Sequence, residues 1–269
     1  MPPSPQDRDF PWWLVAAIAI AMLITWQIVA DDLYSQIFTT VLKGVRITAF
    51  VTVVAFLAAA AIGLVLATMS LSRFLILRQI ARFYIEIVRG IPILVLLFYI
   101  AFVGAPALVI AVNTAIEPLG LDPMRTRDLS LMWRAILALT IGYSAFIAEV
   151  FRAGIQSVDP GQSEAAKALG FSGWQRFRLI VFPQALRTIL PPLGNDFIAL
   201  IKDSSLVSVL GVADVTQLGK IYASGSFRYM ETYNIVAVIY LMMTIGLSLA
   251  LRALERRLRQ TPGKLSGKR

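Results

Sequence analysis

The segment Asp159–Pro183, DPGQSEAAKALGFSGWQRFRLIVFP, is the longest polar interruption in an otherwise apolar chain of 269 residues. Asp159 is suited to cap a helix that has Pro160 at its first position, and Gln162 three residues later is close to a capping box. Gly170 supplies the stop signal for this helix. The segment therefore predicts a short, capped helix and not a loose loop.

A second start signal follows at Ser172 and Gln175, and Pro183 is expected to limit the helix that begins there. A small apolar face lies between the caps, made of Ala165, Ala166, Ala168, Leu169, Phe171, Trp174 and Phe177. Such a face suits docking into a groove of another protein. The alternative is an amphipathic helix on the membrane surface, which would have a polar face rich in Lys and Arg. The first helix has only Lys167 and a face of Ala.

The composition indicates an integral membrane protein. Hydrophobic residues make up 58% of the chain and charged residues 15%, whereas soluble domains average about 45–50% and about 25%. The apolar residues come in long blocks, and no hydrophilic region reaches the roughly 50 residues of a separate domain. We predict one all-α, polytopic membrane domain with short polar ends.

Several functional classes are excluded by the residues that the chain lacks. It has no Cys and no His, which excludes disulfides, thiolate metal sites, zinc enzymes and Ser-His-Asp enzymes, and no metal site is expected. The net charge of +9 does not point to nucleic acid, because its densest cluster, from Arg252 to Arg259 and on to Arg269, directly follows an apolar block. Such a tail is expected to meet anionic membrane lipids.

Six apolar blocks are each long enough to cross a bilayer, for which about 20 residues suffice. They are 12–30, about 47–70, near Phe83 to about Asn113, about 132–153, about 188–211 and about 232–253. Gly104-Ala105-Pro106 is expected to bend or end the third block. Pro191-Pro192 should kink or restart the fifth, either as a hinge or as the end of the preceding polar segment.

The first block is predicted to be a retained helix. Trp12, Trp13 and Trp26 lie near its ends, as in an aromatic belt. The alternative is a cleaved signal peptide, but two acids flank Arg8 and no A-x-A cleavage site follows the apolar core.

The distribution of positive charge predicts the orientation. The segments on the side of both termini and of Asp159–Pro183 hold 14 Lys and Arg, whereas the opposite segments hold six together with seven acids. By the positive-inside rule, both termini and Asp159–Pro183 face the cytoplasm.

The chain has no ATPase motif of its own. A phosphate-binding loop requires G-x-x-x-x-G-K-[ST], and the nearest candidate is Gly219-Lys220, where Ile221 follows and Asp214 occupies the first Gly position. We expect no cofactor in this chain. Any ATP-driven work would need ATP and Mg bound by a second subunit.

The polar segment resembles a known motif. Glu164-Ala165-Ala166, three residues, Gly170, nine residues and then Ile180–Pro183 is similar to the EAA motif of ABC-importer permeases, with Phe182 where the pattern has Leu. Residues 43–100 and 140–210 resemble the polar-amino-acid branch of these permeases. The likeness covers roughly residues 40–258, so the first block lies outside the five-helix core of that branch.

This resemblance implies a type I ABC importer permease fold in the bacterial cytoplasmic (inner) membrane. The expected domains are a tail at 1–11, an extra helix at 12–30, a permease domain at 40–253 with its coupling loop at 159–183, and a basic tail at 254–269. The residues implied to couple the chain to an ATP-binding subunit are Glu164, Ala165, Ala166 and Gly170. The other implied partners are a second, identical or different, permease subunit, an extracytoplasmic solute-binding protein, an amino-acid substrate and membrane lipids.

Charged residues within the apolar blocks are candidates for function, because they are costly in a membrane. Glu86 and Arg89 begin the third block, and Glu149 and Arg152 end the fourth, each pair at a spacing that allows an ion pair along one helix face. They are either structural pairs at the membrane boundary or parts of a cytoplasmic gate.

The fifth block carries the most polar residues. Asn195 and Lys202, and likewise Asp196 and Asp203, are seven residues apart and form two neighbouring stripes, followed by Ser204. One interpretation is a polar translocation path and the other is a structural Lys202–Asp203 pair.

Two other functional classes are compatible with the spans and their charges. One is a secondary transporter or channel driven by an ion gradient, with the acidic and basic residues as its relay. The other is a membrane scaffold without transport. The secondary transporter leaves the E-A-A…G spacing unexplained, and the polar stripe on the fifth block counts against the scaffold. Uptake into vesicles with and without ATP would separate the three.

Overall fold

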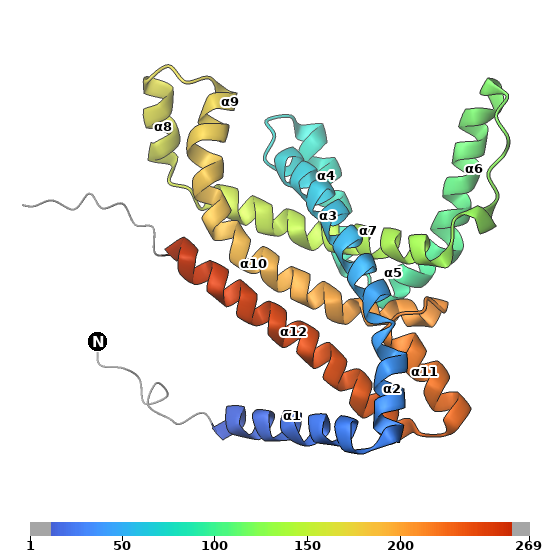
Figure 1. Ribbon diagram of the computed structural model, residues 1–269. Coiled ribbons are helices and arrows are strands. Elements are labelled where there is room, and N and C mark those ends of the chain that lie inside the picture. Colours follow the sequence, from blue (N-terminus) through green and yellow to red (C-terminus); the bar gives the residue numbers. More distant parts are fainter. Residues whose placement is uncertain (1–11, 260–269) are drawn as a thin grey trace, which may run out of the picture.

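The computed structural model describes residues 12–259, and every regular element in that range is a helix, as the all-α prediction requires (Figure 1). The predicted tail at 1–11 and the end of the basic tail at 260–269 lie outside the described residues. The elements are α1 (Trp12–Ala30), α2 (Asp32–Leu42), α3 (Val45–Ser70), α4 (Leu75–Gly90), α5 (Ile93–Tyr99), η2 (Ile100–Gly104), α6 (Ala105–Ile116), η3 (Glu117–Leu119), η4 (Thr126–Asp128), α7 (Leu131–Gln156), α8 (Pro160–Ala168), α9 (Gly173–Arg176), η5 (Phe177–Val181), α10 (Phe182–Asp203), η6 (Ser204–Leu210), α11 (Val215–Ser226) and α12 (Tyr229–Arg259).

The centre of the bundle is the pair α3 and α7, which approach closely because small residues line their contact. A stripe on α3 with four-residue spacing is fully buried and consists of Val51, Ala55, Ala59 and Gly63. A Cβ on Gly63 would lie 2.9 Å from Ile147 Cγ2 and 3.0 Å from the Ser144 carbonyl oxygen. Small residues at this spacing let two backbones approach, which stabilises helix pairs where water does not drive association.

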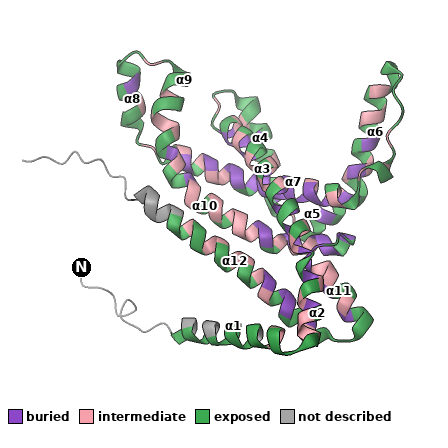
Figure 2. Cartoon of the chain, in the orientation of Figure 1, coloured by how far each residue is buried: buried purple, intermediate pink, exposed green. Residues whose placement is uncertain are grey.

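Helix α10 packs on α7 and α3, and α12 packs on α10. A Cβ on Gly154 of α7 would overlap Ile189 of α10, and one on Gly194 of α10 would overlap Leu251 of α12. The burial pattern follows this order, with most buried residues on α7 and its neighbours and far fewer along α1 (Figure 2).

A buried polar cluster joins α3, α11 and α12. Asp214 has no exposed surface, and its two carboxylate oxygens accept from the Gln217 amide at 2.8 Å and the Tyr240 hydroxyl at 3.0 Å. The Val215 amide donates to Thr48 Oγ1 at 3.3 Å. Burial raises the pKa of the Asp214 carboxyl, against the effect of these hydrogen bonds. Asp214 is therefore a buried helix cap inside the bundle.

Four helical stretches of the described residues are long and apolar enough to cross a membrane. They are Asp32–Ser70, Ile93–Leu119, Leu131–Gln156 and Tyr229–Ala253. The block at 12–30 is the helix α1, which packs on α2 with Trp12 and Trp26 exposed. The block at 188–211 corresponds to the second half of α10 and to η6, where charges and two prolines lower the hydropathy. The count of six spans remains a prediction.

The predicted start of the third span near Phe83 is wrong. The membrane-long stretch begins at Ile93, and Phe83 belongs to the separate helix α4. Ile91 is extended, with φ −97° and ψ 128°, because the ring of Pro92 disfavours a helical residue before it. The sequence pattern did not predict this break, because apolar residues continue on both sides of Gly90.

Two prolines expected to end helices lie within continuous helical stretches instead. Pro106 follows the π-turn η2, and Pro183 follows the π-turn η5. A π-turn leaves room for the proline ring, which would clash with the carbonyl four residues earlier in a regular helix. The prediction that Pro183 limits its segment is therefore wrong, and Gly104-Ala105-Pro106 does not end the third span.

Pro191 and Pro192 lie inside α10, nine and ten residues after it begins at Phe182. The helix is not restarted at them, because it is already formed before them; the interpretation that they mark the end of the polar segment stays a prediction. The hinge interpretation stays a prediction.

The close contact at Gly44 leads to a test of this fold. A Cβ on Gly44 would lie 2.5 Å from the Val215 nitrogen and 2.6 Å from the Asp214 carbonyl carbon, and backbone atoms do not yield as a side chain does. Gly44→Ala should lower the free energy of unfolding by roughly 1–3 kcal/mol, seen as a lower unfolding midpoint in detergent. The control is Gly246→Ala, which meets open space inside α12. Equal midpoints for the two variants would contradict this packing.

Candidate functional site

The helix α8 contains the E-A-A residues and is capped as its sequence predicts at its start. Asp159 Oδ1 accepts from the Gly161 amide at 2.7 Å. Ala166 is the buried residue of this helix, whereas Glu164 and Ala165 are exposed. The helix is thus anchored through one alanine and presents its glutamate and the neighbouring alanine to the outside.

The end of α8 is a Schellman motif centred on Gly170. The Gly170 amide donates to the Lys167 carbonyl at 3.0 Å, and the Phe171 amide donates to the Ala166 carbonyl at 3.1 Å. Gly170 has φ +82°, a conformation that disfavours any residue with a Cβ. The glycine of the motif is therefore needed to end the helix and turn the chain.

The next helix is fastened to α8. Ser172 and Gln175 form the predicted capping box, with bonds of 3.3 Å and 2.8 Å. Arg176 Nη1 donates to Ser163 Oγ at 3.4 Å, which ties α9 to α8. We name residues 159–176 the EAA unit. Figure 1 shows α8 and α9 side by side at one end of the molecule, which we call the α8 end.

The EAA unit exposes large apolar side chains beside the small ones. Leu169 is 77% exposed and Trp174 is 66% exposed. Trp174 stacks on Phe177, with ring centroids 6.0 Å apart, so its ring is held in place although its outer face is free. A rigid, partly apolar surface of this kind is suited to contact another protein.

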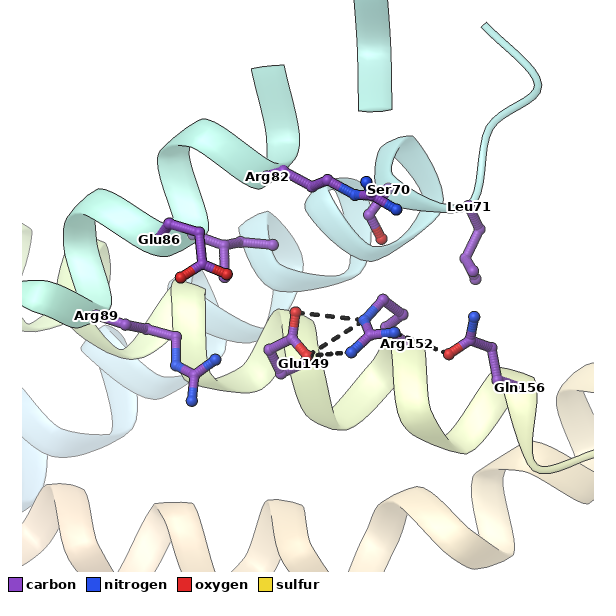
Figure 3. Close-up of a pocket in the computed structure, with 9 residues that line it drawn as sticks. Ser70, Leu71, Arg82, Glu86, Arg89, Glu149, Arg152 and Gln156 are labelled. Atoms are coloured by element: carbon purple, nitrogen blue, oxygen red, sulfur yellow. Dashed lines mark hydrogen bonds and ion pairs between the residues drawn. The ribbon is translucent and has the colours of Figure 1, made fainter. Parts of the chain in front are cut away.

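A second candidate site is a cavity of about 490 Å³ that lies between the end of α3, α4 and the end of α7 (Figure 3). We call it the charged cavity. Its lining residues are Ser70, Leu71, Arg82, Ile85, Glu86, Arg89, Glu149, Arg152 and Gln156. All four residues of the predicted gate pairs are among them. Sequence spacing within single helices thus identified groups that two helices bring together.

One of the two predicted ion pairs forms. Arg152 Nη2 lies 2.5 Å from Glu149 Oε2, and Arg152 Nη1 donates to Gln156 Oε1 at 2.9 Å. The other predicted pair is wrong, because within residues 12–259 the structure has no ion pair between Glu86 and Arg89. The Arg89 guanidinium lies over the Phe146 ring instead, 5.6 Å from its centroid, and this stacking takes it away from the carboxylate one turn earlier.

The polar residues of α10 divide between two environments. Asn195 and Lys202 are exposed, whereas Asp196 and Asp203 are partly buried. This agrees with the two stripes predicted from seven-residue spacing. Ser204 is fully buried at the start of η6, and its hydroxyl donates to the Ile201 carbonyl at 2.7 Å, so it faces its own helix.

The structural Lys202–Asp203 pair is absent from the described part of the chain. Asp203 Oδ2 accepts from the Tyr143 hydroxyl of α7 at 2.8 Å instead. Asp196 Oδ2 is buried without a hydrogen-bond partner among the described residues. A buried carboxylate oxygen is costly when it is unpaired. Asp196 is therefore the residue of this stripe that can still accept a hydrogen bond from a ligand.

Several residues of these sites were missed by the sequence analysis. Tyr143 has no signal beyond its place in an apolar block, because its partner lies 60 residues away. Arg82 and Gln156 could have been found, since each is four residues from a predicted gate residue on the same helix face. The described residues hold no group of three or more acidic side chains placed to bind a metal ion.

A bundle of membrane-long helices, with a capped helix at one end and polar residues along the inner helices, defines a multi-pass membrane transport component. A family model described as "Binding-protein-dependent transport system inner membrane component" matches residues 59–260. This range is most of the chain. The chain therefore belongs to this family of ABC-transporter permease subunits.

Individual relatives agree with the family. The probable amino-acid permease protein YxeN of Bacillus subtilis (strain 168) is 36% identical over 81% of this chain and 91% of its own length. The glutamine transport system permease protein GlnP of Escherichia coli (strain K12) is 36% identical over 81% and 92%.

Solved structures confirm the fold. A chain of an amino acid ABC transporter crystallised with histidines has a TM-score of 0.68 and 36% identity, covering 85% of this chain and 97% of that one. A chain of the MetNI methionine ABC transporter, at 22% identity and a TM-score of 0.63, covers 81% and 96% and shares the fold. The fold class predicted from the sequence is confirmed.

The hydrogen bond between α7 and α10 can be tested directly. Tyr143→Phe removes the donor to Asp203 and leaves a partly buried carboxylate without it, so the free energy of unfolding should fall by about 1–3 kcal/mol. The matched control is Tyr99→Phe, at an exposed tyrosine of α5. Thermal unfolding of both variants in detergent measures the difference, and a Tyr143→Phe midpoint equal to that of the control would contradict the role of this bond.

Proposed function

We propose that this chain is the permease subunit of an ATP-driven importer of amino acids, coupled through the EAA unit to a separate ATP-binding subunit. The single observation that carries the coupling is the construction of α8. A helix of nine residues is closed at both ends by caps, and it exposes Glu164 and Ala165 at the positions of the E-A-A motif. The amino-acid substrate is supported by the names of relatives that are 36% identical.

The remaining parts of the importer are supplied by partners. ATP and Mg bind to the ATP-binding subunits, since this chain has no phosphate-binding loop. A second permease subunit, identical or related, completes the pathway, and an extracytoplasmic solute-binding protein delivers the substrate. The α8 end faces the cytoplasm of a bacterial cell and both termini lie on that side of the inner membrane, as the distribution of Lys and Arg supports.

The connection between α8 and α7 is short enough to transmit movement. Only Ser157, Val158 and Asp159 separate the end of α7 at Gln156 from the start of α8 at Pro160. A partner that shifts α8 therefore shifts the end of α7, and with it the Glu149–Arg152 pair. Closing and opening of the pathway is then an equilibrium between two arrangements, which the ATP-binding subunits bias through their different contacts with α8 in the two states.

The polar face of α10 is the proposed substrate path. Asn195, Asp196, Lys202 and Asp203 are polar groups on a helix of the inner bundle, where an unpaired charge costs at least about 2.5–3.5 kcal/mol in lipid. A water-filled path between two permease subunits removes that cost. Asp196 supports the proposal most, because its buried oxygen has no protein donor and is available to the ammonium group of an amino acid.

Uptake provides the first test of this function. The chain, copurified with its ATP-binding and solute-binding partners and placed in proteoliposomes, should accumulate an amino acid only when ATP is inside the vesicles with the nucleotide subunits. A proton ionophore should leave the rate unchanged, because the energy comes from ATP. Uptake that survives ATP depletion and collapses with the proton gradient would overturn the proposal in favour of a secondary transporter.

The Schellman turn provides a test of coupling. Gly170→Ala places a Cβ in the left-handed region, at a cost of about 1–2 kcal/mol, so the folded EAA unit should be depleted and ATPase association weakened by about 5- to 30-fold. Gly170→Asn should have a milder effect, because Asn tolerates this conformation. Glu164→Ala should also uncouple ATP hydrolysis from uptake while the membrane helices stay inserted.

The matched control for these variants is Gly173→Ala in the same unit, where a Cβ would have Arg176 Nη2 as its nearest neighbour at 3.9 Å. Association with the ATP-binding subunit is measured by copurification and titration, and coupling by ATPase activity stimulated by the solute-binding protein. If Gly170→Ala keeps both at the level of Gly173→Ala, α8 is not the coupling element.

A further inference from the structure

The charged cavity differs from a set of paired gate charges, because much of its charge is unused. Three arginines and two glutamates line it, and only Glu149 and Arg152 form an ion pair. The Arg152 guanidinium of that pair also donates to Gln156. The described structure gives Arg82, Glu86 and Arg89 no ion-pair partner, and the Arg89 guanidinium lies over the Phe146 ring. Unpaired charges of both signs thus face one space.

The arrangement of α4 explains why these charges are directed to the cavity. This helix has three faces. Ala81, Ile85 and Val88 are buried against the bundle, and Arg82, Glu86 and Arg89 follow one another at i, i+4 and i+7 beside them. A third stripe is exposed and apolar, made of Ile76, Ile80, Phe83 and Ile87. The apolar stripe is suited to lipid, so the charged stripe is turned away from it and toward α7, as Figure 3 shows.

We infer that the charged cavity is a binding site for the free amino acid as a zwitterion, and that it holds the substrate at the α8 end of the pathway. Arg82 or Arg89 binds the α-carboxylate, which matches the fork of a guanidinium, and Glu86 binds the α-ammonium. The inference rests on the proposed function, which supplies amino acids as the class of ligand. A volume of about 490 Å³ lies in the range of about 300–1,000 Å³ of small-molecule sites.

The presence of both signs distinguishes this ligand from a simple anion. A phosphate or sulfate would meet the carboxylates of Glu86 and Glu149 as well as the arginines, so part of the lining would repel it. A zwitterion pairs with one unpaired group of each sign, a guanidinium and the Glu86 carboxylate. The proposed contacts hold only the α-carboxylate and the α-ammonium and include none with the side chain of the amino acid. The site should therefore bind amino acids with little selectivity for the side chain.

The site is separate from the polar residues of α10. Asp196 belongs to α10, and no residue of α10 lines the charged cavity. Arg152 and Gln156, by contrast, belong to the last two turns of α7. The charged cavity is therefore a second amino-acid site, next to the segment that leads into α8. The amino acid leaves the pathway from this site at the α8 end.

Binding of L-alanine tests the inference, because it is a zwitterion with a minimal side chain. Saturation-transfer NMR should detect L-alanine on the purified complex of the chain with its ATP-binding subunit, in phosphatidylglycerol nanodiscs without nucleotide or solute-binding protein. L-Alaninamide and N-acetyl-L-alanine, which lack the carboxylate or the ammonium, should fail to compete. Lipid without an amine excludes a headgroup ammonium as the occupant.

Variants assign the signal to the cavity. Glu86→Gln and the double variant Arg82→Gln/Arg89→Gln should each raise the Kd for L-alanine about 10-fold or more, and the double variant Arg82→Lys/Arg89→Lys should have a smaller effect because it keeps the charges and loses the forks. Arg73→Gln, which removes a charge outside the cavity, should leave the Kd unchanged. Size-exclusion elution of each variant with its ATP-binding subunit shows that the fold is kept.

The outcomes separate this inference from the proposed function. If ATP-driven uptake works but L-alanine does not bind, or binds equally to Glu86→Gln, the cavity is not an amino-acid site while the importer function stands. If inorganic phosphate displaces L-alanine and binds more tightly, the site is one for anions and the inference is wrong. If L-alanine binds as expected but no amino acid is taken up, the proposed function fails and the binding site remains.

Discussion

The close packing of α7 between α3 and α10 is the interaction on which the rest of the molecule depends. Gly63 of α3 and Gly154 of α7 lie where any Cβ would meet atoms of the neighbouring helix. In a bilayer the lipid tails are as apolar as the helix surfaces, so helices associate through close contact and hydrogen bonds and gain little from hydrophobic exclusion. Small residues at the contacts of α7 therefore fix the position of this helix, and with it the positions of the functional side chains on α7.

Each candidate site is attached to α7. Tyr143 near its middle reaches Asp203 of α10, Glu149 and Arg152 form one wall of the charged cavity, and Gln156 ends the helix three residues before α8. A rigid central helix makes these positions mutually dependent, because packed interfaces switch between discrete arrangements and do not deform continuously. A displacement of α8 would therefore be transmitted through α7 to the charged cavity and to the polar residues of α10.

Local signals predicted the elements that depend on neighbours in sequence. The sequence correctly predicted the Asp159 cap, the Ser172–Gln175 capping box and the helix stop at Gly170, because caps are made by residues within about four positions. The predicted helix end at Pro183 was wrong, since a π-turn keeps the helix continuous around this proline. The break at Pro92 was missed because apolar residues continue on both sides of it.

The sequence by itself determined the class of protein, the all-α fold and the resemblance of residues 164–183 to the EAA motif, because hydropathy, composition and motif spacing are properties of the chain alone. It also placed Glu149 and Arg152 in an ion pair, since both lie on one helix face. Only the tertiary structure decided that Glu86 and Arg89 stay apart, that Tyr143 and not Lys202 holds Asp203, and that five charges meet in one cavity. The physical reason is that these outcomes depend on which side chain of a distant helix lies closer, and spacing along one helix does not contain that distance.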